Sequence, residues 1–200
     1  MKKINKEILQ LAVPNILSNI SVPLLSSVDT ALMGFEGEAS YLGAVGLASM
    51  VFNLIYWGFG FLRMGTTGMT AQSYGKKDEK EIIGIFGRGM IVAGFIASVL
   101  LVFQIPIGAT SMYLVGVGED TNSLVQEYFN IRIWAAPAAL GLMVLMGWFF
   151  GMQNAMFPLY LTLIINMVNI VFSWTLVRHY NMGIAGVAYG TVMAQYVGLI

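Results

Sequence analysis

Residues 133–177 form a continuous uncharged stretch that reads IWAAPAALGLMVLMGWFFGMQNAMFPLYLTLIINMVNIVFSWTLV. The stretch lies between Arg132 and Arg178 and is too long for one membrane helix, because the hydrocarbon core of a bilayer, roughly 30 Å thick, needs only about 20 apolar residues. The segment from Gly151 to Pro158 carries turn-forming residues and divides the stretch. We therefore predict two membrane-spanning helices here, at about 128–150 and 159–177.

The whole chain has the composition of a membrane protein. Of its 200 residues, 58% are hydrophobic and 10% are charged, whereas roughly a quarter of the residues in soluble proteins carry a charge. The positions of the charges leave room for four further apolar segments, so we predict an all-α membrane protein with six transmembrane helices. The predicted spans are at about 8–35, 41–74, 82–107, 128–150, 159–177 and 183–200.

Composition also excludes several classes of function. The formal net charge is zero, which leaves no basic surface for nucleic acid, so we expect no nucleic-acid partner. The chain has no cysteine and a single histidine, His179, and we expect no metal site. The sequence lacks a phosphate-binding glycine loop, a His-Glu-x-x-His pair and a Gly-x-Ser-x-Gly elbow. We predict that the protein is not an enzyme and has no cofactor.

Lysines indicate the orientation of the chain in the membrane. Three precede the first predicted span and three lie between the second and third, whereas the first loop and the connection after the third span have no lysine or arginine. Basic residues near span ends are retained on the cytoplasmic side, so we predict a cytoplasmic amino terminus. Arg178 and His179 are an exception to this pattern. The first apolar stretch is longer than a signal-peptide core of about 7–15 residues, and we expect a retained helix.

Asp29 is the one acidic residue placed deep within a predicted span. An isolated charge at that depth costs at least about 2.5 kcal/mol, so its carboxyl should face protein or water. A helical projection places on one face the side chains of Asn15, Ser18, Asn19, Ser26, Asp29 and Met33. This stripe either lines a cavity or hydrogen-bonds neighbouring helices. Pro14 and Pro23 allow the helix to kink, as a fixed bend or as a shape that depends on the charge of Asp29.

A second polar stripe is predicted in the fifth span. Its members recur at helical spacing and are Thr162, Asn166, Asn169 and Ser173. The sixth span adds Thr191 and Gln195, one turn apart. Two glycine pairs, Gly147 with Gly151 and Gly186 with Gly190, have the spacing that permits close approach of membrane helices. We expect these glycines to serve packing.

Arg63 lies among the glycines and aromatic residues of the second predicted span. An arginine at this depth can pair with a carboxylate, cap free carbonyl groups, contact substrate or extend toward the membrane surface. We favour capping or extension toward the surface over contact with substrate. We expect structural roles for Arg63, Pro14 and Pro23.

Three stretches of the sequence resemble the multidrug and toxic compound extrusion (MATE) transporters. They are residues 11–19, LAVPNILSN; residues 27–34, SVDTALMG; and residues 61–72, FLRMGTTGMTAQ. The last is the most specific and points to the DinF branch, the DNA-damage-inducible F proteins. The resemblance covers the whole chain as the amino-terminal six-helix lobe. It implies one half of a fold with twelve spans in two lobes related by pseudo-twofold symmetry.

The resemblance also implies a function and a site. Members of the family export organic, often cationic or amphipathic, compounds in exchange for H⁺ or Na⁺, and a carboxylate in the first helix couples the cation. Asp29 stands at the matching place, and Asn169 and Thr191 resemble its partners. Ser173 stands where many relatives carry an aspartate, and losing that carboxylate weakens a Na⁺ site and favours H⁺. The predicted substrate-cavity residues are Asn15, Asn19, Ser26, Met33, Asn53 and Asn166.

We therefore predict one lobe of a multi-pass antiporter in the bacterial cytoplasmic membrane, with the bilayer, a small organic substrate and H⁺, or alternatively Na⁺, as partners. The chain stops within the sixth predicted span, so we expect the second lobe to be absent. Two alternatives stay open. One is a truncated fragment that does not transport, and the other is a half-size transporter that acts as a homodimer.

Overall fold

The computed structural model describes residues 12–17, 20 and 39–200, and this part of the chain contains helices and no strand. Residues 12–17 are helical. The following helices are α2 (Ala39–Trp57), α3 (Gly60–Gly75), α4 (Glu79–Val102), α5 (Gln104–Val115), α6 (Glu119–Arg132), the 3₁₀ turn η1 (Ile133–Ala135), α7 (Ala136–Gly151), α8 (Met156–Arg178) and α9 (Gly183–Leu199). The predicted all-α class is confirmed. The predicted residues that lie outside the described part are Ser18, Asn19, Pro23, Ser26, Asp29 and Met33.

Three of the described helices are long and apolar enough to cross a membrane, at Glu79–Val102, Thr121–Gly151 and Met156–Arg178. A fourth crossing results if the bent pair α2 and α3 is one span. The predicted sixth span corresponds to α9, which has 17 residues. Most of the predicted first span lies outside the described residues, so the count of six stays a prediction.

The predicted second span, 41–74, is not one continuous helix. It is divided into α2 and α3, which meet at an angle of 43°. The break falls at Gly58, and Gly60 begins α3. Glycine gains no side-chain contact in a helix and has the largest backbone entropy to lose, so two glycines so close together weaken the helix at this point. The break therefore has a local cause.

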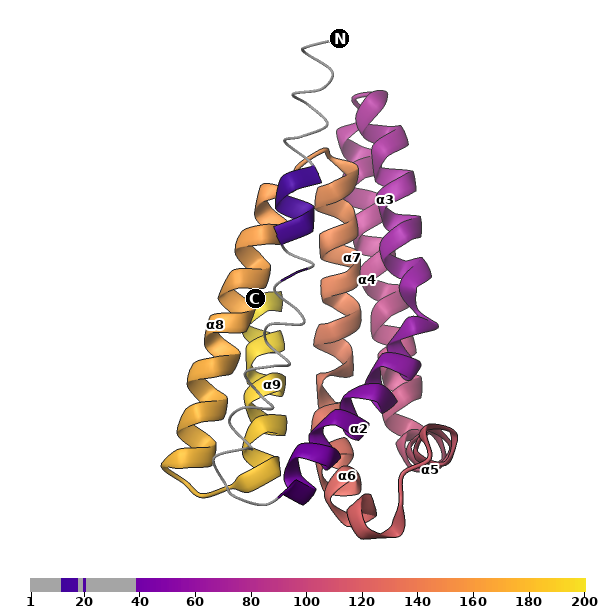
Figure 1. Cartoon of the computed structure of the whole chain (residues 1–200). Coiled ribbons are helices and arrows are strands. Elements are labelled where there is room, and N and C mark those ends of the chain that lie inside the picture. The colour runs from indigo at the N-terminus through magenta and orange to yellow at the C-terminus, as the bar shows by residue number, and fades with distance from the viewer. Residues whose placement is uncertain (1–11, 18–19, 21–38) are drawn as a thin grey trace.

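The predicted third span, 82–107, also ends earlier than expected, because α4 ends at Val102. Pro106 has no backbone N–H to donate, and its ring clashes with the carbonyl group four residues earlier, at Val102. The chain turns at Phe103 and continues as α5, which Figure 1 shows nearly end-on while α4 runs upright. Gly116, with φ of 75°, then ends α5 in the left-handed conformation that suits glycine.

The predicted fourth span begins earlier than expected. We predicted that the connection after the third span reaches residue 128, but α6 begins at Glu119. A carboxylate at a helix N-terminus interacts favourably with the helix dipole, so Glu119 favours a helix start. The helix continues through η1, with Pro137 in the first turn of α7, and ends at Gly151. Proline is tolerated there because the first helical N–H groups have no partner within the helix.

The described helices pack around two hydrophobic clusters. In Figure 1, α3 and α4 lie beside α7, and α8 lies beside α9, while α2 crosses the lower part obliquely. One hydrophobic cluster joins α2, α6 and α9 and includes Phe52, Tyr128 and Ile184. A second joins α3, α4 and α7 and includes Leu62 and Leu140.

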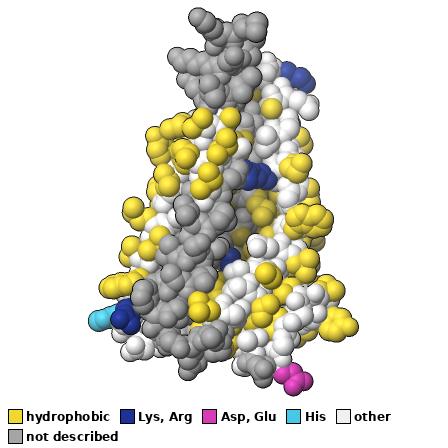
Figure 2. Space-filling view, viewed as in Figure 1, with side chains coloured by type: hydrophobic (Ala, Val, Ile, Leu, Met, Phe, Trp, Pro, Cys, Tyr) yellow, Lys and Arg dark blue, Asp and Glu magenta, His cyan; other side chains and the backbone are white. Residues whose placement is uncertain are grey.

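The outer surface of the described part is largely apolar. Figure 2 shows hydrophobic side chains over much of the visible face, with basic groups at its upper end, in its middle and at its lower left, and an acidic group at its lower end. On α4, Ile91 is 73% exposed and Phe95 is 70% exposed. Large exposed apolar side chains in such number are typical of a surface covered by lipid.

Candidate cation and substrate site

Helices α8 and α9 bring together the polar side chains that the sequence placed in the fifth and sixth spans. The amide nitrogen Nδ2 of Asn169 donates a hydrogen bond to Oγ1 of Thr191 at 3.0 Å. The hydroxyl of Ser173 lies 3.5 Å from Oδ1 of Asn169, at the outer limit for a donated hydrogen bond. All three side chains are buried, with Asn169 only 1% exposed. We call Asn169, Ser173 and Thr191 the α8–α9 polar cluster.

Glycines allow the two helices to approach closely enough for this contact. A Cβ atom added to Gly190 would clash with Oγ of Ser173 and would lie 2.8 Å from its backbone nitrogen. A Cβ at Gly186 would lie 3.1 Å from the backbone nitrogen of Val177. The predicted packing role of the Gly186 and Gly190 pair is therefore confirmed. The backbones of α8 and α9 are close neighbours at the level of the cluster.

The α8–α9 polar cluster presents oxygen atoms but no charge. Thr191 also donates to the backbone carbonyl of Val187 at 3.0 Å, so its hydroxyl proton is used and its oxygen accepts. From the described residues, Oδ1 of Asn169 receives only the long contact from Ser173. Neutral oxygens of this kind can orient a carboxylic acid or complete a cation site, but they need an added carboxylate to balance a cation. Among the described residues, no group of three or more His, Cys, Asp or Glu side chains could hold a metal ion.

The other predicted site residues in the described part are more scattered. Asn166 is half-buried on α8, one turn from Asn169, and Thr162 is buried and donates to the carbonyl of Pro158. Asn15 is half-buried within residues 12–17, next to the buried Pro14. Asn53 is exposed on α2. The cation-coupling and cavity roles of these residues stay predictions.

Arg63 has a structural contact on α7. Its guanidinium carbon lies 5.0 Å from the centre of the Phe150 ring, a cation–π arrangement. Its backbone carbonyl accepts a hydrogen bond from Thr67 and would lie 2.5 Å from a Cβ at Gly147. A Cβ at Gly151 would lie 2.8 Å from the carbonyl oxygen of Thr67. The second predicted glycine pair therefore packs α7 directly on the backbone of α3.

The sequence reading missed a cluster of aromatic rings around Arg132. The guanidinium carbon lies 4.8 Å from the ring centre of Phe52 and 5.4 Å from that of Tyr128. Its Nη1 donates to the hydroxyl of Tyr128 at 2.8 Å. Tyr56, one turn beyond Phe52 on α2, belongs to the same cluster. The signal in the sequence was the spacing of four residues in both helices, Phe52 to Tyr56 and Tyr128 to Arg132.

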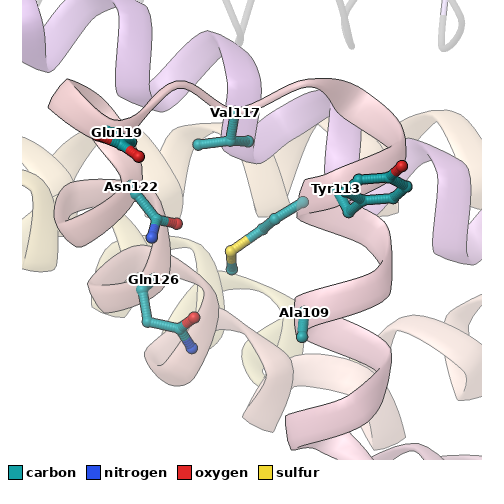
Figure 3. Close-up of a pocket in the computed structure, with 7 residues that line it drawn as sticks. Ala109, Tyr113, Val117, Glu119, Asn122 and Gln126 are labelled. Carbon is teal, nitrogen blue, oxygen red and sulfur yellow. The ribbon is translucent and has the colours of Figure 1, made fainter.

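A shallow open pocket of about 260 Å³ lies between α5 and α6. Figure 3 shows side chains of α6 facing those of α5 across it. Its lining residues are Ala109, Met112, Tyr113, Val117, Glu119, Asn122 and Gln126. None of the predicted site residues is among them.

Comparison with known proteins identifies the family of the chain. A family model described as MatE matches residues 14–175. DNA damage-inducible protein F of Escherichia coli (strain K12) is 35% identical over 98% of this chain and 43% of its own length. Protein DETOXIFICATION 44, chloroplastic, of Arabidopsis thaliana is 28% identical over 97% of this chain and 39% of its own length. The similarity to the first of these agrees with the predicted DinF branch.

Solved structures show the same fold. A MATE protein in complex with MaL6 matches with a TM-score of 0.91 and 18% identity, over 100% of this chain and 45% of that chain. An outward-facing multidrug resistance MATE family transporter matches with a TM-score of 0.87 and 21% identity, over 97% of this chain and 43% of that chain. The chain thus spans less than half the length of these relatives. Because the family model covers most of its residues, the chain belongs to the MatE family.

Proposed function

We propose that the chain is the amino-terminal lobe of a H⁺-coupled antiporter that exports organic compounds across the bacterial cytoplasmic membrane. Asp29 is the residue that takes up and releases the proton. The multidrug and toxin extrusion names of the relatives support export, and the first-helix position of Asp29 supports its role. Na⁺ is the alternative coupling ion.

The observation that carries this proposal is the buried, uncharged α8–α9 polar cluster. Asn169 and Thr191 are fixed to one another by a hydrogen bond at 3.0 Å, and Ser173 adds a hydroxyl where a second carboxylate would strengthen Na⁺ binding. A neutral set of hydroxyl and amide groups suits a partner that alternates between a carboxylic acid and a carboxylate. The oxygens of Thr191 and Asn169 can accept from the acid, and the second N–H of the Asn169 amide can donate to the carboxylate. A proton is then the simplest coupling ion for a single acid.

The charge distribution supports an amino terminus on the cytoplasmic side. Lys76 and Lys77 are exposed at the turn between α3 and α4, at the upper end of Figure 1. Glu119 is exposed at the start of α6, at the lower end. The rule that basic loops stay in the cytoplasm assigns the lysine turn to that side. Because one span precedes α2 in our prediction, the amino terminus lies on the same side as this turn.

Transport by the full-length protein in proteoliposomes tests the proposal, with a pH gradient and a Na⁺ gradient imposed in separate experiments. A fluorescent organic dye serves as the transported compound. We expect the pH gradient alone to drive transport and Asp29→Asn to abolish it. The matched control is Glu127→Gln, which removes an exposed acid on α6 and should leave transport unchanged. Equal transport by Asp29→Asn and wild type, or transport driven by Na⁺ alone, would contradict the proposal.

The length of the relatives makes a second test necessary, because the chain spans 43% of the Escherichia coli protein. The 200-residue chain is expressed alone, and membranes are cross-linked. Export with cross-linked pairs supports the half-size dimer. Export only when a second lobe is supplied in trans supports a lobe that needs a partner half. Absence of export in both settings supports a non-transporting fragment.

A further inference from the structure

We propose that Arg132 and Tyr56 form a binding subsite for the anionic group, a carboxylate or sulfonate, of an amphipathic organic compound. The subsite lies where α2 and α6 meet. This inference deepens the proposed function by naming a substrate class for the lobe. It rests on groups that the cation-coupling mechanism does not use.

The first support is a positive charge inside the protein that has no matching negative charge among the described residues. Arg132 is half-buried near the end of α6. Within the described residues, the ion pair found is Arg88 with Glu81, and no carboxylate lies within ion-pair distance of Arg132. A guanidinium group is always charged at physiological pH, and an unpaired charge at membrane depth is costly. Such a charge favours binding of an anion.

The second support is the presence of unused hydrogen-bond donors. One edge of the guanidinium is occupied, because Nη1 donates to the hydroxyl of Tyr128. Nε of Arg132 and the hydroxyl of Tyr56 are buried, and neither has a hydrogen-bond partner in the part of the chain that the structure describes. Both side chains lie against the same ring, because the guanidinium carbon of Arg132 is 4.8 Å from the ring centre of Phe52 and the ring centre of Tyr56 is 5.8 Å from it. Unsatisfied buried donors are rare in proteins, and each one calls for an explanation.

The third support is the apolar surface around these donors. The ring centres of Phe52 and Tyr56 are 5.8 Å apart, and Phe52 stacks on Phe129 with ring centres 5.3 Å apart. Aromatic rings favour the hydrocarbon part of a ligand, while the faces of Phe52 and Tyr128 stabilise the guanidinium. The combination of an aromatic lining with a charged donor set matches an amphipathic anion. A planar guanidinium is also well suited to a carboxylate or sulfonate, since it can offer two parallel N–H groups.

Equilibrium binding to the full-length protein in detergent tests the proposal by calorimetry. The probes are 1-naphthoate, the neutral 1-naphthamide and the cationic 1-naphthylmethylammonium, which share one ring system and differ in charge. We expect wild-type protein to bind naphthoate at least about 10-fold more tightly than naphthamide, the effect of one charge-assisted hydrogen bond. Equal affinities for the anion and the amide would overturn the proposal, and would indicate that another part of the chain neutralises Arg132.

Variants test whether the preference for naphthoate comes from Arg132 and Tyr56. Arg132→Gln should abolish the preference for naphthoate and leave naphthamide binding unchanged, and Tyr56→Phe should reduce naphthoate binding about 3- to 10-fold. The matched control is Arg178→Gln, at an exposed arginine at the end of α8. Equal loss of all three probes in Arg132→Gln would indicate a packing role and overturn the proposal. Where that variant does not fold, Tyr56→Phe and Arg132→Lys decide, because both preserve the bulk of the cluster.

This binding experiment is independent of transport. It is carried out without an ion gradient, so it gives the same result whether or not Asp29 couples a proton. Loss of transport in Asp29→Asn with an intact preference for naphthoate supports both proposals. A preference for naphthoate in a protein that shows no proton-driven transport would reject the proposed function and keep the anion subsite.

Discussion

Replacement of Gly190 by alanine should separate α8 from α9. The new Cβ would lie 2.8 Å from the backbone nitrogen of Ser173, and ordinary contact begins at about 3.4 Å. The clash with the Ser173 hydroxyl can be relieved by rotation of the side chain, but the clash with the backbone nitrogen cannot. The helices must therefore move apart by several tenths of an ångström. The 3.0 Å hydrogen bond from Asn169 to Thr191 is close enough to be lengthened by the same movement.

The expected cost has two parts. Overpacking in a well-packed interior costs about 1–3 kcal/mol, and a hydrogen bond between membrane helices contributes about 0.6 kcal/mol on average. We expect a total loss of about 2–4 kcal/mol in the free energy of unfolding, which lowers the thermal midpoint by several degrees at roughly 2–4 °C per kcal/mol for a chain of this size. Tryptophan fluorescence of the purified protein during heating measures the midpoint.

Gly94→Ala is the matched control for this experiment. Gly94 is exposed within α4, and a Cβ there meets no atom within 4 Å. Alanine is favoured over glycine in a helix by about 1 kcal/mol, so Gly94→Ala should leave the midpoint unchanged or raise it slightly. If Gly190→Ala and Gly94→Ala give the same midpoint, the close approach of α8 and α9 described here is incorrect.

Three further predictions concern single contacts. Trp148→Phe removes the 2.9 Å hydrogen bond to the carbonyl of Ile82 and should lower the free energy of unfolding by about 1 kcal/mol, measured by thermal unfolding. Trp174→Phe, at a side chain that is 55% exposed, is the control and should cost less. Equal losses of stability in the two variants would contradict the role of this hydrogen bond. Asp78→Ala removes the N-cap of α4 and should cost about 0.5–2 kcal/mol, measured by the same assay, while Asp78→Asn should retain most of the stability. Thr191→Val leaves the amide of Asn169 without its partner and should slow proton-driven dye transport in proteoliposomes; an unchanged rate would remove Thr191 from the coupling site.

The contact between the fifth and sixth spans could be predicted from the sequence because its signal is local. Asn169 and Ser173 are four residues apart, so they share a helix face, and Gly186 with Gly190 marks a surface that a neighbouring backbone can approach. Both signals survive in the structure because nothing interrupts α8 or α9. The cation-coupling role of Asp29 has no comparable local signal in the sequence, because it depends on which groups surround the carboxyl in space.

The interruptions of the other spans were missed for a physical reason. Spans were delimited by charged residues, and a glycine or proline inside an apolar segment changes hydropathy very little. Gly58 and Pro106 break helices through backbone entropy and steric clash, which act independently of hydropathy. Both residues were visible in the sequence, so a rule that considers backbone geometry as well as charge would have found these breaks.

The aromatic cluster around Arg132 could not be predicted from spacing alone. Each helix supplies half of it, and the spacing of four within α2 and within α6 says only that each pair shares a face. The meeting of Phe52 with Arg132 depends on how α2 crosses α6, and neither spacing nor hydropathy describes that crossing. The predicted spans at 41–74 and 128–150 therefore gave no indication of the aromatic cluster around Arg132.

The helix breaks have a mechanical consequence. The interruption at Gly58 and the turn at Phe103 lie between buried residues of the first cluster, such as Phe52 and Met112, and buried residues of the second, such as Leu62 and Leu100. Two segments of the described chain, α2 with α3 and α4 with α5, are therefore interrupted between the two clusters, while α8 and α9 are each continuous helices. Movement of one cluster relative to the other would therefore bend the chain at Gly58 and Phe103 before it separated the closely packed backbones of α8 and α9.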